Sequence, residues 1–307
     1  MQIDSEQHAR ESRRRAHSLM TWTRQLIRSR KRTFVKAAVL CAFLFPVAAP
    51  AQDRTTIPTV KPDAAGQPEA PEANPGRPTV STPATLTPVG YLQFETGVLA
   101  AWNSPEFNRQ TSIGEVMKFS VLPRVELLVA ANPFAHSDTD PNNGTGDTLL
   151  GVQAVIHKGE GLRPTLALSY FGRVRSGDTP DLDIGSAENS VILLASADIK
   201  NFHYDTNYLF NEAVDQDVRR LQFGQTVSVS HPLAGKFGAA GEIWHFTQPF
   251  LRGEAVGNLW AVNYNAKRNL VFDAAFDHGL TSTSTRWEFL AGFTYLLPHR
   301  IDLRRGQ

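Results

Sequence analysis

The sequence has little of several features on which common protein classes depend. Its single cysteine, Cys41, excludes a disulfide framework and a cysteine-ligated zinc or iron–sulfur site. It contains no G-x-x-x-x-G-K-[ST], H-E-x-x-H or G-x-S-x-G pattern, so a phosphate-binding loop, a zincin site and the common serine-hydrolase elbow have no support. We therefore expect no catalytic site, no metal site and no cofactor.

An excess of positive charge is also missing from most of the chain. Residues 1–51 hold 10 of the 31 Lys and Arg but only 3 of the 30 Asp and Glu, which leaves 21 basic and 27 acidic residues in the remainder. A nucleic-acid-binding protein presents a basic face to phosphates, so nucleic acid is not an expected partner. With 41% apolar residues, the chain is too apolar for a disordered protein.

The N-terminal region has the pattern of an export signal. A basic stretch at residues 24–36 is followed by an uncharged apolar run at 37–49 and then by Ala49-Pro50-Ala51. This order is typical of a secretory signal peptide. The apolar run has 13 residues, whereas a membrane-spanning helix requires about 18 or more. We predict that residues 1–51 form a signal peptide, with Met20 as an alternative start.

A proline-rich stretch follows the predicted leader. Residues 52–88 contain eight prolines and no aromatic residue. Such a composition buries too little apolar surface to order itself, so we expect a disordered, extended linker. The sequence leaves open whether this linker enters the pore of a barrel that follows it.

From Val89 to Leu297 the apolar pattern has a period of two. The last segment is the clearest case, because Trp287, Phe289 and Tyr295 share one face with other apolar residues while Glu288 and Thr294 fall on the other. Similar alternation predicts twelve strands. They lie at 91–101, 112–121, 125–131, 147–156, 164–173, 189–199, 202–211, 220–230, 236–245, 258–264, 269–278 and 287–297.

The connections between these strands alternate between short and long. An even strand number with turns of two lengths is typical of an all-β fold, a 12-stranded antiparallel up-and-down transmembrane β-barrel. We expect the barrel at 89–297 in the bacterial outer membrane, with a periplasmic tail at 298–307. The short turns and both termini would face the periplasm. The last strand, with Gly292, Tyr295 and Leu297, resembles the signal by which the outer-membrane assembly machinery recognises barrels, which predicts that machinery and membrane lipid as partners.

Several phrases in this region resemble a family of outer-membrane barrels assigned to transport in the meta-pathway of phenol degradation. The resemblance rests on residues 119–127 (FSVLPRVEL), 146–152 (GDTLLGV), 164–168 with 176–178, 239–242 (AAGE), 270–279 and 287–297. The resemblance implies that the barrel lets a small-molecule solute pass, namely an aromatic or otherwise hydrophobic organic compound. It brings no active site to carry over.

The polar phase of the strands is predicted to face the lumen. Its acids outnumber its bases, which predicts an interior that favours cations or neutral solutes. Glu126 and Glu242 stand as single charges in otherwise apolar strands and are the first lumen residues to test. The lumen candidates are Glu95, Lys118, Glu126, Asp205, Glu242, Asp273 and Glu288, within a wider set that adds Asp198, Asp277, Arg173, Arg220 and Arg286.

Three other interpretations stay open at this point: a structural or adhesive outer-membrane barrel, an outer-membrane lipid hydrolase and a soluble periplasmic β protein. His245 and His278 lie near strand ends where a lipid hydrolase site could form, but no serine stands two residues after either. Residues 138–144 partly resemble a calcium loop, although the glycine is one place late. We interpret that stretch as a surface loop.

Overall fold

A computed structural model describes residues 71–160, 162–178, 187–215, 218–251 and 253–301. The predicted signal peptide, residues 52–70 of the predicted linker and residues 302–307 of the tail lie outside the described residues. None of the described residues forms a helix that is long and apolar enough to cross a membrane.

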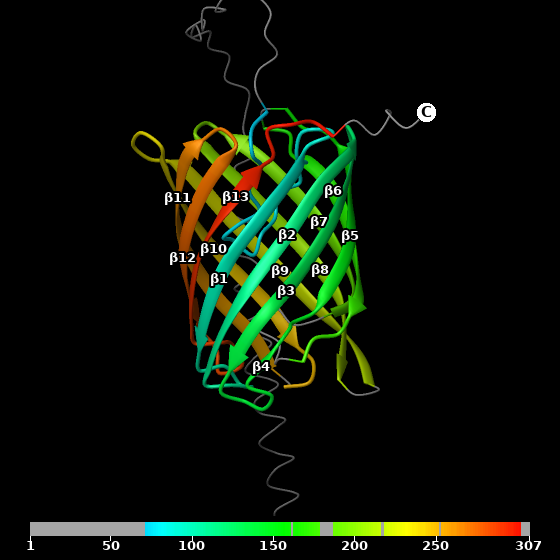
Figure 1. The fold of residues 1–307 in the computed structure, drawn as a ribbon, viewed down its shortest axis with the longest axis vertical. Helices are drawn as coiled ribbons and strands as arrows, with labels where there is room; N and C mark the ends of the chain where they lie inside the picture. Colours follow the sequence, from blue (N-terminus) through cyan, green and yellow to red (C-terminus); the bar gives the residue numbers. More distant parts are fainter. Residues whose placement is uncertain (1–70, 161, 179–186, 216–217, 252, 302–307) are drawn as a thin grey trace, which may run out of the picture. The chain divides into compact units, whose positions relative to one another are not determined.

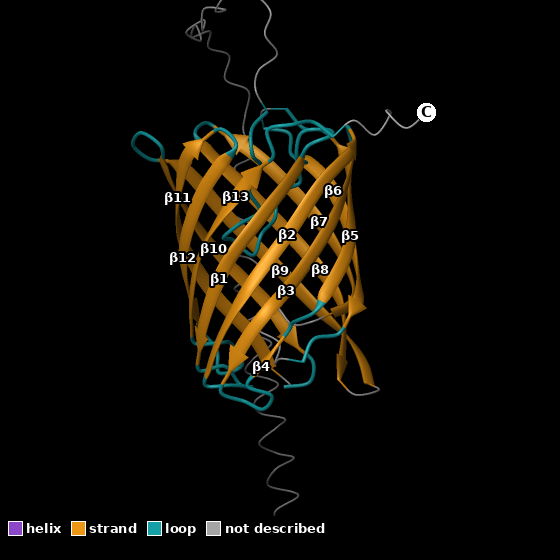
Figure 2. Cartoon of the chain, in the orientation of Figure 1, coloured by secondary structure: helices purple, strands orange, loops and turns teal. Residues whose placement is uncertain are grey.

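The described residues form one antiparallel sheet that closes on itself (Figures 1 and 2). The first strand pairs with both the second and the last, which closes a barrel of twelve long strands. A two-residue strand, β4, adds only a small extension to β3. The strands are β1 (Leu92–Trp102), β2 (Arg109–Leu122), β3 (Val125–Ser137), β4 (Asn143–Gly144), β5 (Thr148–His157), β6 (Thr165–Arg175), β7 (Ala187–Ile199), β8 (Phe202–Asp215), β9 (Val218–Pro232), β10 (Phe237–Gln248), β11 (Gly253–Lys267), β12 (Leu270–Gly279) and β13 (Trp287–Leu296).

The predicted twelve-stranded fold is therefore confirmed, and each predicted strand has its counterpart. Several strands are longer than predicted, mainly at one end of the barrel. Residues 212–219 were expected as a long loop, but residues 212–215 and 218–219 instead continue the β8–β9 ladder, from Glu212 opposite Leu221 to Asp215 opposite Val218. Backbone N–H and C=O groups need partners, and continued pairing supplies them even where the side chains are polar. We call this end the long-loop end and the opposite end, uppermost in Figure 1, the short-turn end.

The two faces of the sheet reverse the usual pattern of a protein in water. Large apolar side chains on the outer face are exposed, including Ile243 at 66% and Trp260 at 65%. Polar side chains on the inner face are buried, including Gln93, Asn207 and Thr226. An apolar outer surface around a closed ladder is the arrangement that lipid requires, because lipid cannot satisfy an open sheet edge.

The outer face predicts one effect on stability. Trp260 lies near the middle of β11, so Trp260→Arg should destabilise the folded barrel in lipid by about 2–4 kcal/mol. Leu221→Arg is the control, because Leu221 is also exposed on the outer face but lies near the start of β9 at the long-loop end, where the cost should be about 0–1 kcal/mol. Urea unfolding of both variants in lipid vesicles measures the difference. Equal effects of the two substitutions would contradict the assignment of Trp260 to the lipid-facing surface.

Candidate functional site

The barrel interior contains the chain's own residues 71–88, which we call the plug. Its backbone is hydrogen-bonded to side chains on the inner faces of β1, β3, β7, β8 and β10. Its entry is held at the short-turn end, where the amide of Ala73 donates to the carbonyl of Arg268 at 2.9 Å. Figure 2 shows the plug as a teal coil among the orange strands.

The plug corrects the predicted linker for residues 71–88. The expectation of disorder was wrong there because it considered only what the segment can bury by itself. Its prolines prevent a regular ladder, but the barrel wall supplies side-chain acceptors for the remaining amides. Ser81 and Ala84 are both fully buried as a result.

The first contact region of the plug is its neck at Gly76 and Arg77. Glu95 on β1 accepts a hydrogen bond from the Gly76 amide at 3.0 Å and pairs with Lys118 on β2 at 2.6 Å. The guanidinium of Arg77 pairs with Asp273 on β12 at 3.3 Å. Both wall carboxylates are almost fully buried, so each depends on these partners to offset its lost hydration.

The second contact region is centred on Glu242 of β10. Its carboxylate accepts from the amides of Val80 at 2.7 Å and Ser81 at 2.6 Å and from the Ser81 hydroxyl at 2.5 Å. The same hydroxyl lies 2.7 Å from the Thr226 hydroxyl on β9. All three of these donors belong to the plug, whereas Glu126 receives two from it.

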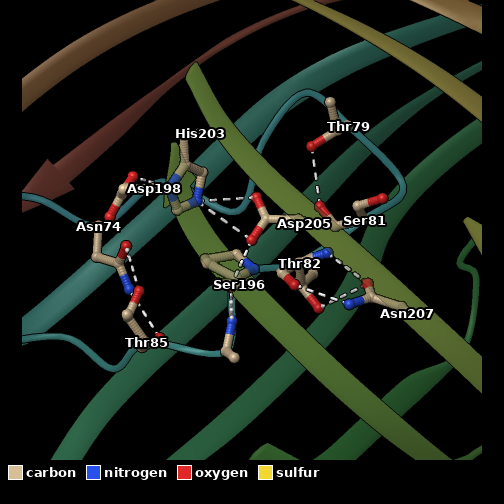
Figure 3. Close-up of polar contacts among 12 residues, drawn as sticks. Asn74, Thr79, Ser81, Thr82, Thr85, Ser196, Asp198, His203, Asp205 and Asn207 are labelled. Carbon is tan, nitrogen blue, oxygen red and sulfur yellow. Dashed lines mark hydrogen bonds and ion pairs between the residues drawn. The ribbon is translucent and has the colours of Figure 1, made fainter. Parts of the chain in front are cut away.

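The third contact region follows β8 and β7 (Figure 3). The side chain of Asn207 accepts from the Thr82 amide at 2.7 Å and donates to the Thr82 carbonyl at 3.0 Å. The Ala84 amide donates to the Ser196 hydroxyl, which donates to Asp205, and Asp205 contacts His203. His203 also contacts Asp198 at 2.7 Å, so a polar chain runs from the plug to the rim of the barrel.

The last contact region returns the chain to the wall beside β2. Glu126 on β3 accepts from the Thr87 amide at 2.9 Å, from the Thr87 hydroxyl at 2.5 Å and from the Ser120 hydroxyl at 3.0 Å. The plug then continues into β1. In sequence order its contacts pass from β1 and β12 to β10, β8, β5, β7 and β3, which is most of the circumference of the inner wall.

A family model described as "Putative MetA-pathway of phenol degradation" matches residues 74–297, which include most of the plug and the whole barrel. The chain belongs to this family. The match starts at Asn74, so the plug from that residue onward is part of the family pattern rather than an appendage to it. A sequence comparison with curated proteins found no match.

Solved structures of similar fold include an outer-membrane channel from Pseudomonas putida F1, with a TM-score of 0.50, 13% identity and coverage of 70% of this chain and 98% of that chain. The NanC porin has a TM-score of 0.48 and 11% identity, covering 67% of this chain and all of that chain. The KdgM porin has a TM-score of 0.45 and 10% identity, with coverage of 66% and 98%. At 13% identity, the similarity to the Pseudomonas putida channel shows that the two chains share the barrel fold, and it shows no more than the fold.

The predicted lumen residues lie on the inner face, and most of them belong to the contact regions of the plug. Glu95, Glu126, Glu242 and Asp273 bind it directly. Lys118 and Asp205 bind it through one intermediate partner each. Glu288 lies apart, opposite Asp277 near the long-loop end. Direct contact of these residues with a solute stays a prediction.

The inner face is less polar than the sequence predicted. Leu209, Trp244 and Phe246 face inward and pack together with Ala255, against Val80 of the plug. The indole N–H of Trp244 donates to Asp277 at 2.7 Å, which satisfies its one polar group. Trp244 and Phe246 lie beyond Glu242 toward the long-loop end, so an apolar region follows the polar contact regions.

The enzyme and calcium alternatives gain no support from the described residues. Among the described residues, neither ring nitrogen of His245 nor Nε2 of His278 has a hydrogen-bond partner. Asp138 accepts from the amides of Asn108 and Arg109, both at 3.1 Å, and the Arg109 bond lowers the pKa of Asp138. That carboxylate therefore joins two loops. The described residues contain no group of three or more His, Cys, Asp or Glu side chains that could hold a metal ion.

Proposed function

We propose that this chain is an outer-membrane channel for small organic compounds of aromatic or otherwise hydrophobic kind, and that its plug controls passage. The observation that carries the proposal is the inner wall itself. Buried carboxylates hold the plug on the short-turn side, and aromatic and aliphatic side chains follow toward the long-loop end. Leu209, Trp244 and Phe246 are buried against Val80 of the plug, so displacement of the plug would uncover apolar contacts for an apolar solute.

The outward face and the family both support the outer membrane as the site of action. A Gram-negative outer membrane excludes apolar molecules because its outer leaflet is densely charged, so an apolar solute needs a protein route. The apolar kind of solute is inferred from the inner wall, and the family description, which names phenol degradation, agrees with an aromatic substrate.

Entry of two probes into intact Gram-negative cells tests this function. N-phenyl-1-naphthylamine, an apolar aromatic amine, becomes fluorescent when it reaches the membrane interior, and nitrocefin, a polar β-lactam, changes colour when a periplasmic β-lactamase cleaves it. Cells that produce the chain should take up the apolar probe several-fold faster than vector controls, with unchanged nitrocefin cleavage. Faster entry of nitrocefin alone would identify a general polar pore, and no change in either probe would reject a channel.

A further inference from the structure

Three residues in register on neighbouring strands form a narrow platform on the inner wall. Asp273 on β12 is opposite Gly292 on β13, and Gly292 is opposite Gly97 on β1. The two glycines meet at the seam where the first and last strands close the barrel. With no Cβ atom at either glycine, the platform is bare backbone with a carboxylate at one end.

The guanidinium of Arg77 occupies this platform. A Cβ atom at Gly97 would overlap the guanidinium group, and one at Gly292 would lie 2.8 Å from its Nη2 atom. Nη2 also lies 3.3 Å from the Asp273 carboxylate, and the Arg77 side chain is only 16% exposed. The glycines therefore leave the space that the planar cation fills, and glycine within a strand is typical where another group approaches closely.

The contact suits arginine in particular. A guanidinium is planar, so it can lie flat against backbone while it donates to a carboxylate at its edge, whereas the compact ammonium of lysine cannot cover the same surface. Arg77 is the single basic residue between positions 71 and 88. The plug thus has one cation for a wall whose contact carboxylates include Glu95, Glu126 and Glu242.

We propose that Asp273, Gly292 and Gly97 form a guanidinium-binding site and that Arg77, its resident ligand, latches the plug in the barrel. Arg77 acts as a positioning residue, since it holds the neck while the amides of residues 80–87 engage the wall. The latch holds the plug whether or not a solute passes. Its consequence for permeability rests on the proposed function.

A buried thiol on the plug gives a readout that does not depend on transport. Ala84 is fully buried, and Cys41 lies within the predicted leader, so Ala84→Cys in a Cys41→Ser chain gives a single reporter cysteine. Gly97→Ala should displace the guanidinium without altering Arg77 or Asp273. We expect the rate at which a water-soluble maleimide modifies Cys at position 84 to rise about tenfold or more, as loss of about 1.4 kcal/mol of docking energy would cause.

Gly114 supplies the matched control. It pairs with Gly97 on the next strand, but a Cβ atom there would meet only Asn132 at 3.4 Å. Gly114→Ala should therefore leave the modification rate unchanged. Gly292→Ala is unsuitable because its Cβ would also lie 2.5 Å from the backbone oxygen of Thr96. The slower migration of boiled barrel on a detergent gel verifies that each variant has folded.

The double variant decides whether Gly97 acts through Arg77. Arg77→Ala alone should raise the modification rate, and Gly97→Ala in that background should add nothing. A full additional increase in the double variant, or no increase in a folded Arg77→Ala chain, would overturn the latch. If the latch variants raise thiol modification while uptake of the apolar probe stays at the vector level, the latch stands and the proposed function fails.

Discussion

Deletion of residues 71–88 is expected to raise the single-channel conductance of the barrel several-fold. The plug is bonded to β1, β3, β7, β8, β10 and β12 and therefore contacts strands around most of the inner wall. Removing it exposes the carboxyl groups of Glu95, Glu126 and Glu242 to water in the lumen. Cations should therefore carry most of the added current.

Planar-bilayer recordings measure both effects, with the reversal potential in a salt gradient reporting the ion preference. A chain in which a Gly-Ser segment of equal length replaces the plug is the matched control, since it keeps the tether but lacks the contacts. Both altered chains should conduct more than the native chain. Equal conductance of all three folded chains would contradict the assignment of the plug as the barrier.

Glu242→Gln is expected to have the second largest effect. Hydrogen bonds to a charged acceptor contribute about 1.5–3 kcal/mol each, and Glu242 receives three from Val80 and Ser81. A glutamine retains one oxygen acceptor and turns an amide N–H₂ toward these donors. We expect docking of the plug to weaken by about 3 kcal/mol, which is roughly a hundredfold in its equilibrium.

Thiol modification at position 84 and uptake of the apolar probe both measure the weakened docking. Glu254→Gln is the matched control, because Glu254 is exposed on the adjacent strand β11 and faces outward. The control should match the native chain. If folded Glu242→Gln behaves like the control, the carboxylate is not an anchor of the plug, and the hydroxyl and amide contacts elsewhere must hold it.

The strand pattern was predictable because it depends on local order along the chain. A period of two brings Trp287, Phe289 and Tyr295 to one face whatever the neighbouring strands are, and the same rule identified the inward positions of Glu126 and Glu242. The lengths of β8, β9 and β11 were not predictable from polarity. Their outer ends are held by cross-strand backbone pairing, to which polar residues such as Glu212 contribute as well as apolar ones.

The inward aromatic residues show the limit of the polarity rule. Trp244 and Phe246 share a face with Glu242, so one face of β10 is both charged and aromatic. A pattern that classes each residue only as apolar or polar labels a whole strand face by its more common residue type. Only the packed interior shows that this face is divided along its length between plug contacts and an apolar cluster.

The sequence by itself determined the twelve-stranded barrel, which face of each strand its side chains occupy and the family to which the chain belongs. It also predicts the export signal. The barrel, the strand faces and the predicted signal follow from composition and from a period of two, and the family follows from the resemblance of short stretches such as residues 119–127; all of these are local features. Only the tertiary structure decided that residues 71–88 fill the barrel. The anchoring bonds join positions far apart in the chain, 162 residues between Val80 and Glu242, and a proline-rich segment becomes ordered only where a closed wall presents its acceptors.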